Sequence, residues 1–248
     1  MPPPAAPSDA QTAAKRATGE AAAALVEDGM RLGLGTGSTT AFAIEALGRR
    51  VRGGLDVVGV PTSFAAERLA RAAGVPVVSL GELGLDTLPA GRPALDLALD
   101  GADEVDPDGA LVKGRGAAHV REKVVAALAA RFVVLVDASK RVERLGTTQP
   151  VPVEVLPFAE PAVARALRAL GARPRLRMGQ RKDGPVVTDQ GLWVLDARFD
   201  GVDDPAGLGA AIDGLPGVLG HGLFVGMATD VLVGEGDGRV DHVVHERP

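Results

Sequence analysis

DGADEVDPDGALVKGRGAAHVREK, from Asp100 to Lys123, connects a predicted apolar strand, Leu95 to Leu99, with a predicted helix, Ala117 to Ala130. The segment combines acidic residues, a strong turn signal at residues 106–109 and a glycine-rich loop in one βα connection. In α/β proteins, ligands bind where the carboxyl ends of parallel strands meet such loops. The segment therefore predicts an α/β fold and the position of a functional site.

The alternation of strand and helix continues on both sides of this segment. Predicted strands are Met30 to Gly35, Asp56 to Val60, Val75 to Ser79 and Phe132 to Val136, and predicted helices are Ala13 to Glu27, Ala41 to Leu47 and Ser63 to Ala73. Such alternation is typical of a parallel sheet with crossover helices. Only 3% of the residues are aromatic, so we expect a closely packed core of Ala, Val and Leu.

The character of the sequence changes after Leu145. Predicted elements are then a proline-flanked strand near residues 150–157, a helix from Ala159 to Leu170, extended segments Pro185 to Val187 and Leu192 to Asp196, a helix from Asp204 to Asp213, and an extended stretch from Gly217 to Phe224. We predict a smaller α+β, ferredoxin-like domain over residues 146–224. It is inserted in a Rossmann-like domain of residues 1–145 and 225–248. After the insertion, the chain returns to this larger domain with two predicted strands, Thr229 to Val233 and Val240 to Val244.

Charge and composition exclude several classes of protein. The 248 residues carry 27 basic and 32 acidic side chains without a long run of either sign, so a nucleic-acid partner is not expected. The lack of Cys excludes disulfides and thiolate metal ligands, and the four His lack metal-ligand spacing. No uncharged apolar run reaches the about 18 residues of a membrane span. We expect residues 1–16 to be a disordered lead without a secretory signal, and the protein to be cytoplasmic.

A glycine turn, Gly35 to Thr40, joins a predicted strand to the start of a helix. Free backbone N–H groups, the positive helix end and several hydroxyls suit a phosphate, although an ordinary βα turn with a Ser or Thr cap fits the same residues. The glycine spacing does not match G-x-G-x-x-G, the next strand ends in Pro-Thr-Ser where a ribose-binding acid would stand, and Gly-Lys-Ser/Thr is missing. Dinucleotide and P-loop nucleotide sites are therefore disfavoured.

Two further features lie inside the opening segment. Asp100 and Asp103, with Glu104 beside them, could shift each other's pKa values or orient hydroxyl groups, but a solvated turn capped by Asp side chains is the commoner arrangement. The loop Lys113 to Gly116 leads into a helix and could hold an anion, or it could be a solvated surface loop. For each feature taken alone, both the functional and the ordinary structural interpretation remain open. The occurrence of these features together favours a functional site.

Glu122 is a candidate because of its place on the predicted helix. We predict an apolar stripe of Val120, Val124, Ala127 and Leu128, with Glu122 nearly opposite and small residues one turn to either side. These neighbours would leave room around the carboxylate. A charged triplet such as residues 121–123 is more often a solvated helix face, so Glu122 depends on the other features.

Four motifs, in this order and spacing, resemble those of the type A ribose-5-phosphate isomerases: GLGTGSTT (33–40), LDGADEVD (99–106), KGRGAAHVREK (113–123) and VDASK (136–140). The resemblance extends to PVEV (152–155), VTDQG (187–191) and GLF (222–224). It implies a Rossmann-like domain with a smaller α+β domain, and a homodimer or homotetramer. It also implies cofactor-free interconversion of D-ribose 5-phosphate and D-ribulose 5-phosphate through an enediol or enediolate, a step of the pentose phosphate pathway.

The resemblance also implies roles for individual residues. Glu122 would be the general base that moves a proton between C2 and C1 of the open-chain sugar. Asp100 and Asp103 would hold hydroxyls and assist ring opening, and Lys113 would stand beside the developing enediolate. The implied substrate-binding residues are Thr36, Gly37, Ser38, Thr39, Asp100, Gly101, Ala102, Asp103, Lys113, Gly114, Arg115, Gly116 and Lys140, with Lys15 as a further phosphate contact; no metal site is implied.

Two residues depart from the family pattern. Arg115 replaces a glycine, which would strain the backbone if the position needs positive φ, or would add a contact to phosphate or hydroxyl. His119 stands where an apolar residue is usual. Two other functions remain open: a sugar-phosphate sensor, because effector domains of some transcription regulators share this fold by resemblance, and a nicotinamide-dependent enzyme. The presence of Glu122 and the length of the chain disfavour the sensor, and the missing fingerprint disfavours the second.

Overall fold

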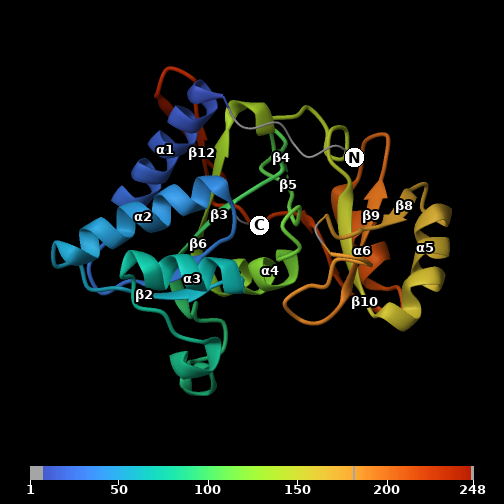
Figure 1. Cartoon of the computed structure of the whole chain (residues 1–248), viewed down its shortest axis with the longest axis horizontal. Helices are drawn as coiled ribbons and strands as arrows, with labels where there is room; N and C mark the ends of the chain where they lie inside the picture. Colours follow the sequence, from blue (N-terminus) through green and yellow to red (C-terminus); the bar gives the residue numbers. More distant parts are fainter. Residues whose placement is uncertain (1–7, 181, 247–248) are drawn as a thin grey trace.

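The computed structural model describes residues 8–180 and 182–246, with a parallel sheet and its helices on one side and an antiparallel sheet on the other (Figure 1). Of the predicted disordered lead, residues 1–7 lie outside the described residues. The prediction is wrong for the rest, because helix α1 (Asp9–Ala24) begins there. Ser8 Oγ accepts from the Gln11 N–H at 3.2 Å and the Gln11 side chain accepts from the Ser8 N–H, a capping box that fixes the helix start.

The larger sheet has six strands in the order β13-β12-β6-β3-β1-β2. They are β1 (Arg31–Leu34), β2 (Val58–Pro61), β3 (Leu95–Gly101), β6 (Ala129–Asp137), β12 (Asp230–Gly234) and β13 (Val240–Val244). Neighbouring strands are parallel except β12 and β13, which pair antiparallel at one edge. The last two strands therefore join the sheet of the first half of the chain, as predicted.

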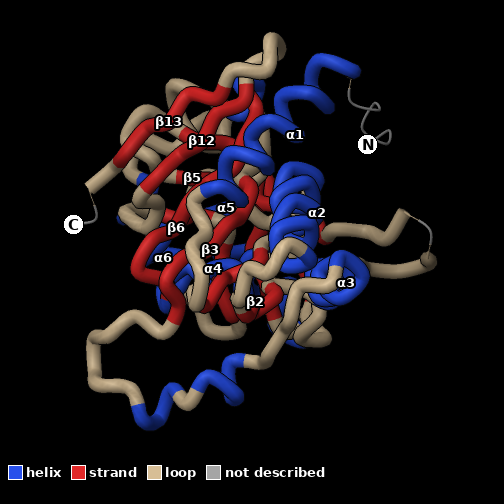
Figure 2. The backbone as a smooth tube through the Cα atoms, turned by 90° about the vertical axis from the view of Figure 1, so that its left-hand side faces the viewer, coloured by secondary structure: helices blue, strands red, loops and turns tan. Residues whose placement is uncertain are grey.

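Helices cover both faces of this sheet, and the side chains of β6 alternate between them. Val133 and Leu135 pack with the helices of one face, whereas Phe132 and Val134 pack with the helix of the other. The first face is covered by α1, α2 (Ser38–Arg52) and α3 (Phe64–Ala73), and the second by α4 (His119–Leu128). Figure 2 shows α1, α2 and α3 together on one side of the strands. This layering is the α/β arrangement that the sequence predicts.

The predicted strand Val75 to Ser79 is wrong. Only Val77 pairs, as an isolated bridge with Gly59 of β2. Pro76 has no N–H to donate, so the ladder cannot extend along this segment. The chain continues instead through two short 3₁₀ helices, η1 (Leu80–Leu83) and η2 (Leu85–Thr87), in the excursion at the bottom of Figure 2.

A second sheet has four antiparallel strands in the order β10-β7-β9-β8. We call it, with its two helices, the antiparallel unit: β7 (Val151–Val155), α5 (Glu160–Ala169), β8 (Arg173–Leu176), β9 (Trp193–Arg198), α6 (Pro205–Asp213) and β10 (Val218–His221). The sequence does not predict β8 because its residues, RPRL, are too basic for a strand pattern. The predicted strand Pro185 to Val187 is wrong, since its ends make only isolated bridges.

A small third sheet connects these two parts. It consists of β4 (Glu104–Val105), β5 (Leu111–Val112) and β11 (Leu223–Phe224). The Asp100–Lys123 segment therefore pairs with β11, the strand that directly follows β10 of the antiparallel unit. The mixed α/β fold, with a mainly parallel sheet and a smaller antiparallel sheet, is confirmed. The division into domains at residues 146 and 224 stays a prediction. Among the described residues, no helix has the length and apolar character needed to cross a bilayer.

Candidate active site

Asp100 lies at the carboxyl end of β3, beside the end of β1. Its Oδ1 accepts hydrogen bonds from the Thr36 N–H at 3.0 Å and the Gly101 N–H at 2.7 Å. A Cβ on Gly35 would collide with this carboxylate, so the close approach of the two strand ends requires glycine there. The glycine turn and the first acid of the Asp100–Lys123 segment therefore form one unit.

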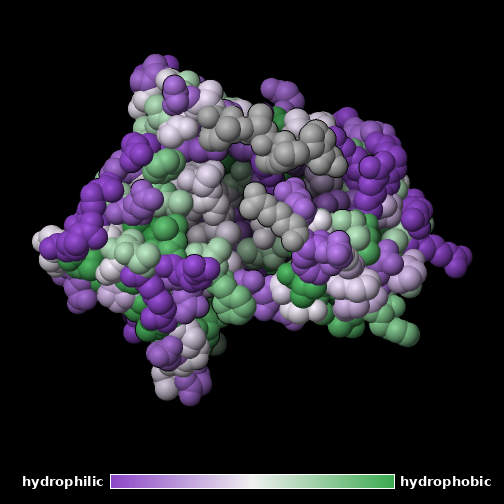
Figure 3. Space-filling model, viewed as in Figure 1, coloured by the Kyte–Doolittle hydropathy of each residue, from purple (hydrophilic) through white to green (hydrophobic). Residues whose placement is uncertain are grey.

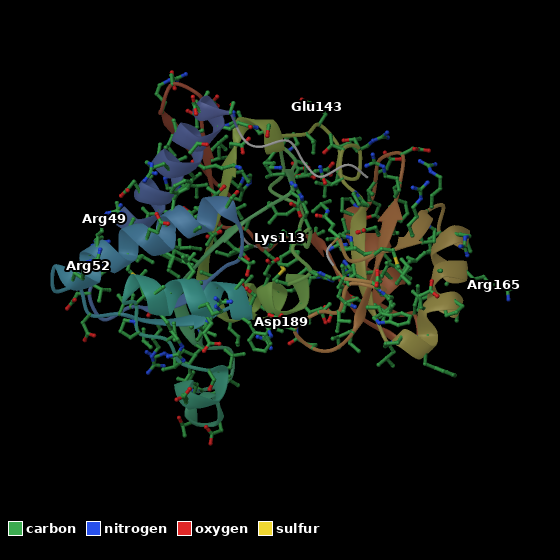
Figure 4. The ribbon with its side chains drawn as sticks, in the orientation of Figure 1. Arg49, Arg52, Lys113, Glu143, Arg165 and Asp189 are labelled. Carbon is green, nitrogen blue, oxygen red and sulfur yellow. The ribbon has the colours of Figure 1, made fainter. Side chains whose placement is uncertain are left out.

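Lys113 joins two carboxylates in the interior of the molecule. Its Nζ lies 3.1 Å from Asp100 Oδ2 and 3.2 Å from Glu122 Oε2, and it donates to the Gly101 carbonyl oxygen. The three side chains are at most 5% exposed. Figure 4 shows Lys113 at the centre of the molecule, between the parallel sheet and the antiparallel unit. We call Asp100, Lys113 and Glu122 the buried triad.

The buried triad places two carboxyl groups around one ammonium group, away from water. Burial, reinforced by the charge of Asp100, raises the pKa of Glu122 to about 8, although Lys113 acts against the rise. Burial also raises the pKa of Asp100, again against Lys113. For Lys113, burial favours the neutral amine, but the two carboxylates outweigh it and raise its pKa above the usual value. The lysine thus stays a fixed cation, while Glu122 can exchange a proton near neutral pH.

The face of α4 differs from the prediction. The buried residues are His119, Glu122, Val125 and Ala126, whereas Val124 of the predicted apolar stripe is 44% exposed. The prediction assumed that the carboxylate would face away from the core. Glu122 instead lies on the buried face, where Lys113 Nζ lies 3.2 Å from its Oε2.

Asp103 and Glu104, although adjacent, have different partners. Asp103 Oδ2 accepts from the Arg115 N–H at 2.9 Å and so fixes the loop that follows Lys113. Glu104 is fully buried and accepts from the backbone N–H groups of Gly146, Thr148 and Gln149 at 2.6 to 2.7 Å. Glu104, which stands beside the aspartates in the sequence, therefore binds a turn at residues 146–149.

A cluster of hydroxyls borders the glycine turn. Thr36 Oγ1 lies 2.9 Å from Thr62 Oγ1 and 2.6 Å from Ser63 Oγ. Thr62 and Ser63 are not among the residues predicted for the site. Their signal was available, because they follow β2, whose carboxyl end lies beside that of β1 at the same edge of the sheet.

The predicted phosphate turn forms the N-terminus of α2. Gly37 has φ +143°, which favours glycine, and Ala41 donates to its carbonyl oxygen at 2.9 Å. Ser38 and Thr39 lie in the first turn of the helix, between Gly37 and Ala41. Ser38 is exposed and Thr39 is buried. Figure 3 shows this side of the molecule hollowed near its centre, between the helices and the antiparallel unit. The turn therefore offers an anion both N–H groups and the positive end of a helix.

The two departures from the family pattern have structural explanations. Arg115 is not at positive φ; among described non-glycine residues only Ala117 is, with φ +60°, so the substitution causes no strain. The Arg115 side chain is exposed. His119 is fully buried beneath the loop, and a Cβ on Gly114 would lie 2.7 Å from its Nδ1. Burial lowers the pKa of His119 to about 3, so the ring is neutral and fills the place of an apolar side chain.

Of the remaining predicted residues, Ala102 lies half-buried beside Gly101, and Gly116 is exposed in the loop. Lys15 on α1 and Lys140 in η3 (Ala138–Lys140) are half-buried. Within residues 8–180 and 182–246, neither lysine makes a hydrogen bond or ion pair with the buried triad. The structure thus brings together the acids, Lys113 and the two loops, but not these two lysines.

Comparison with known sequences gives one family. The sequence model of "Ribose 5-phosphate isomerase A (phosphoriboisomerase A)" matches residues 58–238. Ribose-5-phosphate isomerase A of Thermosynechococcus vestitus is 54% identical over 242 residues, covering 96% of this chain and 99% of its own. The protein of the same name from Haloarcula marismortui is 53% identical over 226 residues, with coverage of 91% and 93%.

Solved structures agree with the sequences. Ribose 5-phosphate isomerase A of Methanocaldococcus jannaschii superposes with a TM-score of 0.85 at 43% identity, covering 93% of this chain and 98% of its own. A D-ribose-5-phosphate isomerase in complex with phospho-erythronic acid gives a TM-score of 0.86 at 43% identity, with coverage of 94% and 98%. The chain and these relatives are thus similar in sequence, in length and in fold over almost the entire chain. The chain therefore belongs to the ribose 5-phosphate isomerase A family.

Proposed function

We propose that the protein interconverts D-ribose 5-phosphate and D-ribulose 5-phosphate through an enediolate, as an aldose–ketose isomerase that needs no cofactor. The buried triad carries this proposal. A carboxyl group with its pKa raised to about 8 lies 3.2 Å from a fixed ammonium group, which is what proton transfer at carbon requires. Membership of the family supports the same reaction.

In the proposed mechanism, Glu122 removes the C2 proton of the open-chain aldose. The electron pair of the C–H bond forms the C1–C2 double bond, and the negative charge moves to O1, where Lys113 stabilises it. Glu122 then returns the proton to C1, while the O2 proton transfers to O1, which gives the ketose. Asp100 and Asp103 hold the sugar hydroxyls and assist ring opening.

The phosphate is distant from the reacting carbons and orients them. We assign its binding to the Thr36–Thr39 turn and the Gly114–Gly116 loop, with Lys15 and Lys140 as further contacts. The helix end at Ser38 supports this assignment, as does the exposed Gly116, whose N–H has no hydrogen-bond partner among the described residues. Binding energy from the phosphate can offset the cost of aligning C2 with Glu122.

Two finer statements belong to the same proposal. We infer a homodimer or homotetramer, which size-exclusion chromatography with light scattering tests as a mass of two or four chains. We also place the protein in the cytoplasm, because the chain contains no Cys and nothing in it needs an oxidising compartment.

Incubation with D-ribose 5-phosphate in deuterium oxide tests the proposed reaction. Conversion to the ketose with deuterium at C1 is expected, because the proton held on Glu122 exchanges with solvent during part of the turnovers. Binding of the sugar phosphate without conversion would contradict the isomerase and favour the sugar-phosphate sensor. Conversion that depended on added nicotinamide cofactor would favour the third alternative.

A further inference from the structure

Arg177 reaches from the antiparallel unit to the substrate loop, which we define as Lys113–Gly116. It follows β8, and its Nη1 donates to the carbonyl oxygens of both Gly114 and Arg115 at 3.0 Å. Its Nε donates to Asp196 Oδ2 at 2.9 Å and its Nη2 to Asp196 Oδ1. The Arg177 side chain is only 15% exposed. One guanidinium group therefore joins a carboxylate on β9 to two successive carbonyls of the substrate loop.

The substrate loop needs such support because of its backbone conformation. Gly114 has φ +102° and Ala117, just after the loop, has φ +60°. Gly114 adopts this conformation without a penalty, but at Ala117 the left-handed region costs about 1 to 2 kcal/mol, so it persists only where neighbouring groups hold it. His119 fills the space beneath Gly114, and Asp103 holds the Arg115 N–H. The contact from Arg177 completes this support by holding the carbonyls.

The form of the contact requires arginine. A guanidinium group can donate in two directions of one plane, here to a carboxylate and to a pair of carbonyls. An ammonium group has a single nitrogen and cannot span both partners. The Gly114 carbonyl oxygen also accepts from the Ala117 N–H at 2.9 Å. The Gly116 N–H has no hydrogen-bond partner among the described residues and remains available to a ligand.

We propose that Arg177, held by Asp196, is a positioning residue that keeps the substrate loop in its binding geometry. The antiparallel unit is then part of the substrate site, although the buried triad lies outside it. This inference rests on the proposed function only in taking Lys113–Gly116 as a substrate loop.

Arg177→Gln tests the inference, with Arg173→Gln as a matched control. Arg173 lies on β8 and also forms a two-bonded pair with an aspartate, Asp200, at 2.5 and 2.9 Å. This pair is exposed, and among the described residues Arg173 makes no hydrogen bond to the substrate loop. We expect Arg177→Gln to raise the KM for D-ribose 5-phosphate and the Kd for phospho-erythronic acid by a common factor of at least about tenfold, with kcat changed less than KM. Equal KM values in the two variants would refute the role.

Amide hydrogen exchange of the free protein gives a readout that needs no catalysis. Residues 114–118 should exchange faster in Arg177→Gln than in Arg173→Gln, while β3 and β6 keep their protection. An unchanged loop would overturn the inference even if activity fell. Conversely, a wild-type protein without isomerase activity would remove the proposed function but leave this exchange result interpretable.

Arg177→Lys distinguishes the fork of donors from the charge alone. Its KM should stay closer to that of Arg177→Gln than to the wild-type value, because an ammonium group cannot bridge Asp196 and the two carbonyls. A wild-type KM in Arg177→Lys would contradict the geometric argument.

Discussion

Glu122 combines two opposing electrostatic effects. Burial and the neighbouring Asp100 favour its neutral form, and Lys113 favours its charged form, with the first two effects prevailing. A carboxylate with a raised pKa is a stronger base than one in water. When Glu122 takes a proton from the sugar, negative charge moves from the carboxylate to the sugar. Lys113, 3.2 Å from Glu122, is placed to stabilise that charge. Glu122 can therefore accept a proton as a carboxylate and hold it as a carboxylic acid until the proton is returned.

The pH dependence of kcat/KM follows from this pKa. The base must be ionised in the free enzyme, so kcat/KM should fall about tenfold for each pH unit below about 8 and level off above it. The substrate phosphate loses its second proton near about pH 6, so the range from about 7 to 9 reports on Glu122. A rate profile that is flat over this range would show that the pKa of the base is not raised.

Single residues differ in how far the sequence predicts them. The sequence predicts Asp100 because it follows an apolar strand and Lys113 because it opens a glycine-rich loop, and the structure joins them at 3.1 Å. The partners of Asp103 and Glu104 could not be predicted, because alternate residues at a strand end point in different directions. Thr62 is not predicted, because Pro-Thr-Ser at the end of β2 indicates only that a ribose-binding acid is lacking there.

At the scale of elements, the start of α4 decides where Glu122 lies. The helix begins at His119, two residues after the predicted start, because Ala117 is left-handed. A pattern of apolar residues alone suggested the wrong buried face. Periodicity finds apolar stripes, but it contains no information about a lysine that neutralises an acid from another loop.

Gly114→Ala tests the conformation of the substrate loop. Its φ of +102° disfavours any side chain, and a Cβ would lie 2.7 to 2.9 Å from three atoms of His119. We expect a loss of stability of more than about 1 kcal/mol and a KM raised at least about tenfold, measured by thermal unfolding and steady-state kinetics.

Gly54→Ala is the matched control for this substitution. Gly54 has φ +105°, but a Cβ there would meet no atom within 4 Å. It should therefore lose about 1 to 2 kcal/mol of stability with an unchanged KM. If both variants keep the wild-type KM, the loop does not depend on Gly114.

At the scale of the whole molecule, the Asp100–Lys123 segment joins the parallel sheet to the small third sheet. β3 contributes Asp100 to the parallel sheet, and β5 pairs with β11 next to the antiparallel unit. The parallel order was predictable from alternating strands and helices. The contact of Arg177 with the substrate loop was not, because the partners are 62 and 63 residues apart and β8 lacks a strand pattern.

The stability of the molecule should depend on Glu122. Its pKa is raised from 4.5 to about 8, so the folded state binds a proton that the unfolded state releases. This stabilisation is complete below about pH 4.5 and is lost as the pH rises through about 8, by up to about 1.4 kcal/mol per unit. Glu122→Gln removes the titration. As the pH is raised from 5 to 8, the melting temperature of Glu122→Gln should therefore increase relative to that of the wild type, by about 2 to 4 °C for each kcal/mol that the wild type loses. A difference independent of pH would contradict the buried, raised pKa.

The most direct measurement is the turnover of D-ribose 5-phosphate by Glu122→Gln at pH 8, beside the binding of phospho-erythronic acid and an exposed control, Glu143→Gln. The amide keeps the shape of the side chain but cannot take a proton from C2. We predict a fall in kcat of at least about 10²-fold, with the Kd of phospho-erythronic acid within a few-fold of wild type and an unaffected control. Turnover within about tenfold of wild type would contradict Glu122 as the base.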